Sequence, residues 1–400
     1  MLIVQKYGGS SVATAEKIRY VAEKVVATKR AGNKVIVVVS AMGKTTDNLI
    51  SLAKEVHPSP PEREMDLLLS TGEIVSVSLL CMAIENLGEP AEGMTGYFAG
   101  IKTDSFHTKA RIQTIEPSRV IDELEKGSIV VIAGFQGISP ESTITTLGRG
   151  GSDLTAIAIA AAVKADLCEI YTDVEGVFTT DPHLIPEARH IPEISYDEML
   201  EMASAGAKVM QSRAVEFAKR YGVPFVVKST FGKGEGTMVK EIALKEGADV
   251  SSVSLDEKQA KLTIFRVPDR PGIAGKIFSE LGKENINVDV IVQNVSKENF
   301  TDISFTINIA DVDKAMKIMQ KVAKEIDAKD VLCDKNIAKV SIIGIGMMNH
   351  PGVAGRMFET LAREDVNIEM ISTSEIKISC VIKKSDGIKA LKALHREFIK

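Results

Sequence analysis

The chain has 400 residues, of which 44% are hydrophobic and 26% are charged, and its formal net charge is -5. This composition is typical of a folded chain with two or three domains. Tryptophan is absent and no basic stripe with interleaved aromatic residues occurs, so nucleic-acid binding has no support. The four cysteines are scattered without CxxC spacing, which indicates buried thiols in a reducing compartment.

The apolar stretches give no targeting signal. The N-terminal MLIVQKYGG is too short an apolar run for a signal peptide, and the charge-free stretches elsewhere fall short of a membrane span. We therefore expect a cytoplasmic protein whose partners are small molecules and other copies of the chain.

The first predicted strand, Leu2 to Gln5, runs into the stretch KYGGSS and then into a helix from about Thr14 to Lys29. A lysine, two glycines and two hydroxyls at the end of a strand form an anion-binding turn, because open α/β sheets place ligands at such strand ends. Taken alone, Lys6 is more often a solvated lysine than a phosphate ligand.

The second predicted strand is the continuous apolar run Val35 to Val39, which suits a strand buried on both faces of a parallel sheet. Hydroxyl residues follow it, among them Ser40 and Thr46. They are candidate ligands for a small polar substrate, or alternatively caps of the next helix.

A long helix is predicted from about Met65 to Asn86, and it carries the sequence STGE near its beginning. A glycine and an acid inside an otherwise apolar helix conflict with local propensity, and such conflicts concentrate at functional sites. Glu73 could bind a substrate ammonium, or it could be an exposed helical acid. The next stretch, Phe98 to Ile112, is expected to be a polar loop, and Ile129 to Gly134 a buried strand.

The stretch TTLGRGGSDLTAIAIAAAV, residues 145–163, reads as a strand, a glycine turn and the N-terminus of an alanine-rich helix. Free N–H groups at such an N-terminus attract anions, and glycines allow a phosphate to approach the backbone. Arg149 adds a planar fork suited to a carboxylate or a phosphate. The alternative is a plain connection in which Ser152 or Asp153 caps the helix.

Further strands are predicted at Cys168 to Thr172 and Phe225 to Ser229, with a helix ending near Tyr221 between them. Two acids and a turn follow the first of these strands, a suitable place for a nucleotide or its metal. The alternation of strands and helices over roughly 240 residues predicts a parallel-type αβα sandwich.

Six motifs, in this order, resemble those of the aspartate kinase family: KYGGSS (6–11), VSAMG (39–43), STGE (70–73), TLGRGGSD (146–153), YTDVEGVFTTDP (171–182) and GAK (206–208). The resemblance spans the family's whole catalytic domain. It implies the amino acid kinase fold, with ATP and Mg²⁺ as cofactors and L-aspartate as the phosphoryl acceptor.

The resemblance also assigns roles to single residues. The catalytic positions are Lys6, Asp153 and Lys208. The aspartate-binding positions are Ser40, Thr46, Glu73 and Arg149. The nucleotide positions are Lys6, Gly8, Gly9, Ser10, Thr172, Asp173, Phe178, His183, Lys208 and Val209. Phe178 stands where the family often has tyrosine and His183 where it often has arginine, and a neutral histidine is a weaker phosphate ligand.

The C-terminal part contains a duplication. Residues 267–291 are repeated as residues 347–371, with Pro271–Gly272 matching Pro351–Gly352 and Asn287 matching Asn367. This looks like two α+β ACT domains of the βαββαβ, ferredoxin-like type. We expect residues 1–245 to form the kinase domain and residues 262–337 and 338–400 the two ACT domains, with Glu246 to Gln259 as a polar connection.

ACT domains bind amino acids at the interfaces between them, and the family's effector positions match Asp269, Ala274, Gln293 and Asn294. The second repeat has Thr373 and Ser374 where the first has Gln293 and Asn294. The resemblance implies feedback inhibition by threonine, lysine or both, in a homo-oligomer formed through the ACT domains. A shorter regulatory chain, started for example at Met238, could take part. The repeat could alternatively serve dimerisation alone.

Two alternative functions remain open at this stage. One is another kinase of the amino acid kinase group, acting on glutamate or a nucleotide. The other is an amino-acid-sensing regulatory protein whose kinase fold has lost its activity. The set of Lys6, Glu73, Arg149 and Asp153 argues against the sensor.

Overall fold

The computed structural model describes residues 1–206, 209–242, 250–294, 299–345, 347 and 351–399. These residues form two compact units. The first contains residues 1–178, 190–203 and 209–242, and the second contains residues 179–189, 204–206 and the described residues from 250 onward. The chain therefore contributes to the second unit from Thr179, well before the first unit ends.

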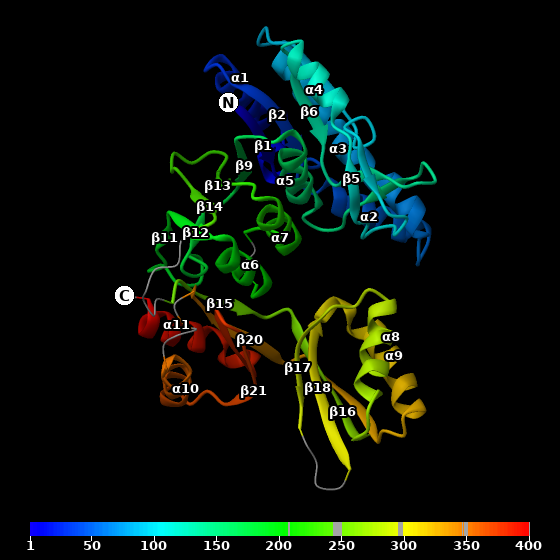
Figure 1. The fold of residues 1–400 in the computed structure, drawn as a ribbon, viewed down its shortest axis with the longest axis vertical. Coiled ribbons are helices and arrows are strands. Elements are labelled where there is room, and N and C mark those ends of the chain that lie inside the picture. Colours follow the sequence, from blue (N-terminus) through cyan, green and yellow to red (C-terminus); the bar gives the residue numbers. More distant parts are fainter. Residues whose placement is uncertain (207–208, 243–249, 295–298, 346, 348–350, 400) are drawn as a thin grey trace. The chain divides into compact units, whose positions relative to one another are not determined.

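An open sheet with the strand order β12-β14-β13-β9-β1-β2-β6-β3 forms the centre of the first unit (Figure 1). Strand β1 pairs in parallel with β2 and β9, and β13, β6 and β3 extend the parallel array, whereas β14 runs antiparallel to β13. The strands are β1 (Leu2–Tyr7), β2 (Lys34–Val39), β3 (Ala91–Met94), β6 (Ile129–Ala133), β9 (Leu167–Thr172), β12 (Glu193–Ser195), β13 (Phe225–Ser229) and β14 (Thr237–Lys240).

Helices cover both faces of this sheet. Helices α1 (Ala15–Arg30) and α3 (Glu62–Glu85) pack on each other and bury apolar side chains against one face of β1, β2 and β6. Helices α5 (Gly151–Val163) and α7 (Ser212–Tyr221) pack together, and α5 lies on β1, β2 and β9. Because α5 is apolar all round, its residues from Gly151 to Ala160 are buried. The predicted αβα sandwich is confirmed.

The longest charge-free stretch of helix α3, between Glu73 and Glu85, falls short of a membrane span, as expected from the sequence. The whole helix is nevertheless long and apolar enough to cross a membrane by length and composition, and 44% of its most apolar 18-residue stretch is buried. The helix packs against α1, β3, β6 and α2 (Thr45–Val56), and it buries Asp66, Ser70 and Glu73. Buried acids and contacts with a sheet are features of the core helix of a folded domain.

A small second sheet lies beside the first, with the order β5-β4-β7-β8. Its strands are β4 (Ile101–Thr103), β5 (Ile112–Ile115), β7 (Gln136–Ile138) and β8 (Ile144–Thr146). The stretch Phe98 to Ile112, expected to be a polar loop, therefore contains a strand and the start of another, and only its middle is a loop. Strand β8 leads directly into the glycine turn before α5, so this sheet fixes where that turn begins.

The second unit contains two four-stranded sheets, each covered by two helices (Figure 1). The first has the order β17-β18-β16-β19 and the second β15-β20-β22-β21. The elements of the first are β16 (Gln259–Pro268), α8 (Ile273–Lys283), β17 (Val288–Gln293), β18 (Phe300–Asn308), α9 (Val312–Glu325) and β19 (Asp330–Asp334). This βαββαβ order is the predicted one.

The second sheet takes one strand from an unexpected place. Its own repeat supplies β20 (Ile337–Ile343), α10 (Val353–Arg363), β21 (Ile368–Thr373), β22 (Lys377–Lys383) and α11 (Gly387–Phe398). The remaining edge is β15 (Ser252–Asp256), which pairs antiparallel with β20. Residues 252–256 are therefore not a polar connection, and the first βαββαβ repeat is inserted between β15 and the rest of the second.

The two sheets of this unit face each other through a pair of matching ion pairs. Lys261 on β16 pairs with Glu369 on β21, and Lys339 on β20 pairs with Asp289 on β17. The lysines begin the matching sequences KLTI and KVSI, and the two acids occupy equivalent positions of the repeat. Lys339 is fully buried. The duplication in the sequence thus appears in space as an approximate two-fold arrangement.

Candidate active site

The site begins with an ion pair between the first strand and the main helix. Lys6 on β1 and Asp153 in the first turn of α5 place Nζ and Oδ1 2.6 Å apart. Both residues are only 8% exposed. Because β1 alternates its side chains, Lys6 points to the α5 side of the sheet while Tyr7 points to the α1 side. A buried lysine held by one carboxylate at a helix N-terminus presents its remaining N–H groups to an anion.

The glycine turn after β1 packs tightly against the residues that follow β2. A Cβ atom on Gly9 would lie 2.7 Å from the carbonyl oxygen of Ala41, and Gly43 donates its N–H to the carbonyl of Gly9 over 2.9 Å. A Cβ atom on Gly8 would lie 3.4 Å from Nζ of Lys6. The absence of side chains here brings the two strand ends together and keeps the backbone open to a ligand.

We expect Gly9→Ala to lower the melting temperature of the protein by several degrees, because the added methyl group overlaps a backbone carbonyl and overpacking costs about 1–3 kcal/mol. Gly8→Ala is the matched control. Its added methyl group would meet only ordinary contacts, so its melting temperature should stay close to the wild-type value. Thermal unfolding followed by circular dichroism measures both, and equal losses in the two variants would contradict this account of the turn.

The second glycine turn precedes α5. Gly150 is the N-terminal cap residue of the helix and has a left-handed backbone with φ of 70°. A Cβ atom there would also lie 2.7 Å from Cβ of Gln211. The helix begins at Gly151, one residue before the Ser152 expected to open it, and neither Ser152 nor Asp153 is its cap. Asp153 is thereby free to pair with Lys6.

Helix α3 and the end of β2 meet at a further glycine. A Cβ atom on Gly72 would lie 2.8 Å from Cβ of Ala41 and 3.5 Å from Cγ2 of Thr45. The next residue, Glu73, is 3% exposed and accepts a hydrogen bond from the backbone N–H of Ala41 over 3.2 Å. The glycine in STGE therefore allows the acid to reach the end of β2.

Glu73 lacks a partner for half of its carboxylate. Its Oε2 is buried without a hydrogen bond. Burial raises the pKa of Glu73 from 4.5 to about 7, although the backbone hydrogen bonds it accepts act in the opposite direction. A buried carboxylate with an open oxygen and a raised pKa is suited to receive a cation from a ligand. The sequence alternative of an exposed helical acid is wrong.

The other predicted acceptor-binding residues lie around this point. Ser40 follows β2 directly, and Thr46 is half-buried in the first turn of α2. Arg149 is different, because its side chain is 94% exposed. Its nearest charged partner is Asp47 in the same turn of α2, at 3.7 Å. The glycine turn before α5 and the beginning of α2 are thus neighbours, and the Arg149 guanidinium is unburied.

Two of the predicted nucleotide residues, Thr172 and Asp173, lie at the end of β9. Gly8 donates its N–H to the carbonyl of Tyr171 and Thr230 donates its N–H to the carbonyl of Thr172, so β9 lies between the two turns. The Thr172 hydroxyl donates to Asp173, which is exposed.

The remaining predicted nucleotide residues lie in different parts of the chain, and His183 belongs to the second unit rather than the first. Phe178 packs edge-on against the ring of His190 at 5.6 Å. His183 belongs to the segment 179–189 of the second unit, where its backbone N–H donates to Asp181. Ser10 is exposed and Val209 is half-buried. Lys208 lies outside the described residues.

The predicted effector positions all lie in the first βαββαβ repeat. Asp269 directly follows β16, and Ala274 lies in the first turn of α8. Gln293 is the last residue of β17, and Asn294 follows it. All four are exposed in the single chain. Strand β17 is an edge strand. An edge strand with exposed polar residues at its end is able to pair with another chain.

Sequence reasoning overlooked two residues that hold this site together, Asp66 on α3 and Arg213 on α7. Asp66 is fully buried and accepts hydrogen bonds from two other segments of the chain. Arg213 donates to the carbonyls of Leu147 and Ala110, and burial lowers its pKa. Asp66, like Glu73, is an acid inside an apolar helix, so the same conflict with local propensity marks both residues in the sequence.

Three family models match the chain, one for a kinase domain and two for ACT domains. The amino acid kinase family model matches residues 1–229, and ACT domain models match residues 261–324 and 340–398. The fold and the glycine-lined strand ends therefore define an amino acid kinase followed by two ACT domains.

Relatives of known name show which branch of the amino acid kinases this chain belongs to. The chain is 51% identical to an aspartokinase of Mycolicibacterium smegmatis over 403 residues, covering 99% of this chain and 96% of that protein. It is equally 51% identical to an aspartokinase of Pseudomonas aeruginosa over 400 residues, covering 99% and 97%. The solved aspartate kinase of Synechocystis is 46% identical with a TM-score of 0.56, covering all of this chain and 69% of that one. The chain belongs to the aspartokinase family.

Proposed function

We propose that this protein transfers the γ-phosphoryl group of ATP to the β-carboxylate of L-aspartate, giving 4-phospho-L-aspartate, the first step of lysine, threonine and methionine biosynthesis. The observation that carries the proposal is Glu73. Its buried, partnerless Oε2 sits at the end of β2, where a substrate ammonium would complete its hydrogen bonding. The names of the aspartokinase relatives support the choice of substrate.

In this proposal, Lys6 and Asp153 bind and stabilise the transferring phosphoryl group. Lys6 binds the transferring phosphate and neutralises the charge that develops on it, while Asp153 holds the ammonium in place. The backbone of Gly8, Gly9 and Ser10 lines the path of the phosphates. The nucleotide itself occupies the end of β9, with Thr172, Asp173, Phe178, His183, Lys208 and Val209 as its proposed contacts.

The acceptor is held by four further residues. Glu73 takes the ammonium of aspartate, Arg149 takes a carboxylate, and Ser40 and Thr46 donate hydroxyl hydrogen bonds. Arg149 is exposed, so a bound carboxylate would have to draw its guanidinium away from Asp47. No general base is needed, because a carboxylate is already ionised at neutral pH and is itself the nucleophile. The site therefore acts by alignment and charge neutralisation.

Mg²⁺ is the proposed metal. Within the described residues, no group of three or more His, Cys, Asp or Glu side chains could hold a metal ion. Mg²⁺ commonly keeps several waters and binds through substrate phosphates, so we propose that it would be held mainly by ATP, with few protein ligands, and would help to neutralise the charge of the phosphates.

Phosphoryl transfer can be tested by ADP release with a panel of acceptors. L-Aspartate should support turnover with ATP and Mg²⁺, whereas glutamate, N-acetylglutamate and UMP should not. Turnover with one of those three instead would assign the protein to another branch of the amino acid kinases. Binding of amino acids without any turnover would assign it to the sensor class.

For regulation, we propose that threonine, lysine or both inhibit the enzyme by binding at Asp269, Ala274, Gln293 and Asn294. The turn before α8 offers backbone N–H groups to the effector carboxylate, and Gln293 ends the neighbouring edge strand. The effector would shift the balance between an active and an inactive arrangement of an oligomer formed through the ACT domains.

We expect Gln293→Ala to raise the effector concentration for half-inhibition at least about tenfold, because one buried polar contact to a ligand is worth about 1–2 kcal/mol. Thr373→Ala, at the equivalent position of the second repeat, is the matched control and should change it less. Initial rates with and without added threonine and lysine measure both. Unchanged inhibition in Gln293→Ala would overturn the site assignment.

The remaining assignments are proposals of the same kind. We place the protein in the cytoplasm and expect a homo-oligomer, with a shorter regulatory chain as an additional candidate partner. We retain residues 1–245 as the kinase domain and residues 262–337 and 338–400 as the ACT domains, with β15 added to the sheet of the second.

A further inference from the structure

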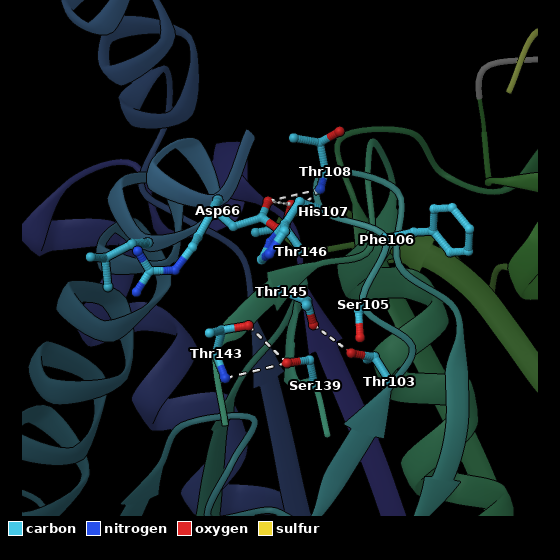
Figure 2. A network of polar contacts seen from close by, with 12 residues as sticks. Asp66, Thr103, Ser105, Phe106, His107, Thr108, Ser139, Thr143, Thr145 and Thr146 are labelled. Carbon is cyan, nitrogen blue, oxygen red and sulfur yellow. Dashed lines mark hydrogen bonds and ion pairs between the residues drawn. The ribbon is translucent and has the colours of Figure 1, made fainter. Parts of the chain in front are cut away.

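Asp66 is a fully buried acid on α3, two helical turns before Glu73. Its two carboxylate oxygens accept hydrogen bonds from three groups (Figure 2). Nδ1 of His107 lies 2.8 Å from Oδ2, the Thr108 N–H lies 3.0 Å from both oxygens, and the Thr146 hydroxyl lies 2.5 Å from Oδ1. A buried carboxylate is stable only when its oxygens are satisfied in this way.

These contacts join three distant parts of the chain. His107 lies 41 residues from Asp66 in the loop that follows β4, and Thr146 lies 80 residues from it at the end of β8. The loop also lies directly on the chain after β8, because Ala110 donates its N–H to the carbonyl of Thr146 over 2.9 Å. Asp66 therefore ties both the loop and β8 to α3.

The segment tied by Asp66 leads straight into the glycine turn. Thr146 precedes Arg149 by three residues, and Gly148 between them has a φ of 79° and lies against the carbonyl of Thr108. On the far side, Arg213 donates to the carbonyls of Leu147 and Ala110 at 2.9 and 3.0 Å. The turn that carries Arg149 is thus clamped between α3 and α7.

We propose that Asp66 is a positioning residue of the acceptor subsite, which sets the place of the Arg149 turn relative to Glu73. Asp66 and Glu73 lie on one side of the same rigid helix, since residues seven apart in a helix share a face. Fixing Thr146 to Asp66 therefore fixes the start of the Arg149 turn to the helix that carries Glu73. The inference rests on the proposed function, in which Glu73 and Arg149 hold the two ends of aspartate.

Strand β8 offers a matched pair of variants for the test. Thr145 and Thr146 are neighbours and both are fully buried, but they point to opposite faces of the strand. The Thr146 hydroxyl bonds to Asp66 on α3, whereas the Thr145 hydroxyl bonds to Thr103 on β4 over 2.6 Å (Figure 2). Thr146→Val and Thr145→Val each remove one buried hydrogen bond at constant shape.

Thr146→Val is expected to raise the KM for aspartate about tenfold or more, because small displacements of binding groups have large kinetic effects, while the KM for ATP stays within about twofold. Thr145→Val should lose comparable thermal stability and keep both KM values. Thr146→Ser, which retains the hydroxyl, should restore the wild-type KM. Asp66→Asn should resemble Thr146→Val. If it fails to fold, His107→Gln, on the loop, should still raise the aspartate KM.

The outcomes distinguish a failure of the positioning role of Asp66 from a failure of the proposed function. An unchanged aspartate KM in Thr146→Val, or an equal rise in Thr145→Val, would overturn the positioning role even though wild-type turnover is normal. Absence of aspartate-dependent turnover in the wild-type protein would overturn the proposed function, and the positioning role with it.

Discussion

Replacing Lys6 with methionine is expected to lower kcat about 10²–10³-fold, because the variant loses the cation that neutralises charge on the transferring phosphoryl group. Lys6 is also one half of a buried ion pair with Asp153. Removing one partner of such a pair leaves an uncompensated charge and costs about 3–5 kcal/mol of stability. The variant should therefore be both slower and less stable.

A second substitution separates these two effects. Lys6→Met combined with Asp153→Asn has no buried unpaired charge, so its melting temperature should recover toward the wild-type value. Its kcat should remain low, since the lysine is still absent. Steady-state kinetics with saturating ATP and aspartate, together with thermal unfolding, provide both readouts. Recovery of kcat along with stability would show that Lys6 acts only structurally.

Replacing Glu73 with glutamine is expected to raise the KM for aspartate on the order of 10²-fold, because a charge-assisted contact to the substrate ammonium is lost in a buried site. The shape of the side chain is conserved. The KM for ATP should change little. If the aspartate KM of this variant stayed within a few-fold of wild type, Glu73 would not be the ammonium site.

The same variant should be more stable than the wild type at alkaline pH. Burial raises the Glu73 pKa from 4.5 to about 7, so the folded state holds a proton that the unfolded state releases. The stability that this proton provides is present below about pH 4.5 and is lost as pH rises through about 7. Because a difference of one in pKa between the folded and unfolded states corresponds to about 1.4 kcal/mol, the free energy of unfolding falls by about 3 kcal/mol over this range. Glutamine does not ionise, so Glu73→Gln does not lose this stability as pH rises. The melting temperatures of the variant and the wild type should therefore differ near pH 8 and agree near pH 5.

The raised pKa also predicts proton release on substrate binding. At about pH 7 roughly half of the Glu73 side chains are protonated, and an ammonium beside the carboxylate favours the ionised form. Calorimetry of aspartate binding in two buffers of different ionisation enthalpy should detect this proton. Glu73→Gln is the control. If the same number of protons were released on aspartate binding in both proteins, Glu73 would not be the residue that binds the ammonium.

Much of the site could be predicted because its determinants are local. Glycines after strands, a lysine at a strand end and an acid inside an apolar helix are visible within a few residues of sequence. The structure brings Lys6 to Asp153 and Glu73 to Ala41, and both contacts lie at the ends of neighbouring strands of the parallel sheet. The αβα sandwich was predicted from the alternation of strands and helices, and the first βαββαβ repeat from the duplicated sequence and its resemblance to ACT domains.

What could not be predicted depends on long-range pairing. Strand β15 joins the second ACT sheet across the whole first repeat, and its sequence SVSLD alone looks like part of a connection. The hydrogen bonds of Asp66 span 41 and 80 residues, so no local pattern marks them. The sheet formed by β4, β5, β7 and β8 has strands of three or four residues, too short for a clear alternation.

The most direct test of the central claim is to trap the product with hydroxylamine, using wild-type protein and Glu73→Gln in parallel with ATP, Mg²⁺ and L-aspartate. The acyl phosphate of aspartate would be captured as its β-hydroxamate. We expect aspartyl β-hydroxamate from the wild-type protein and only a small fraction of it from Glu73→Gln at the same aspartate concentration. No hydroxamate from the wild type, or equal amounts from both proteins, would contradict it.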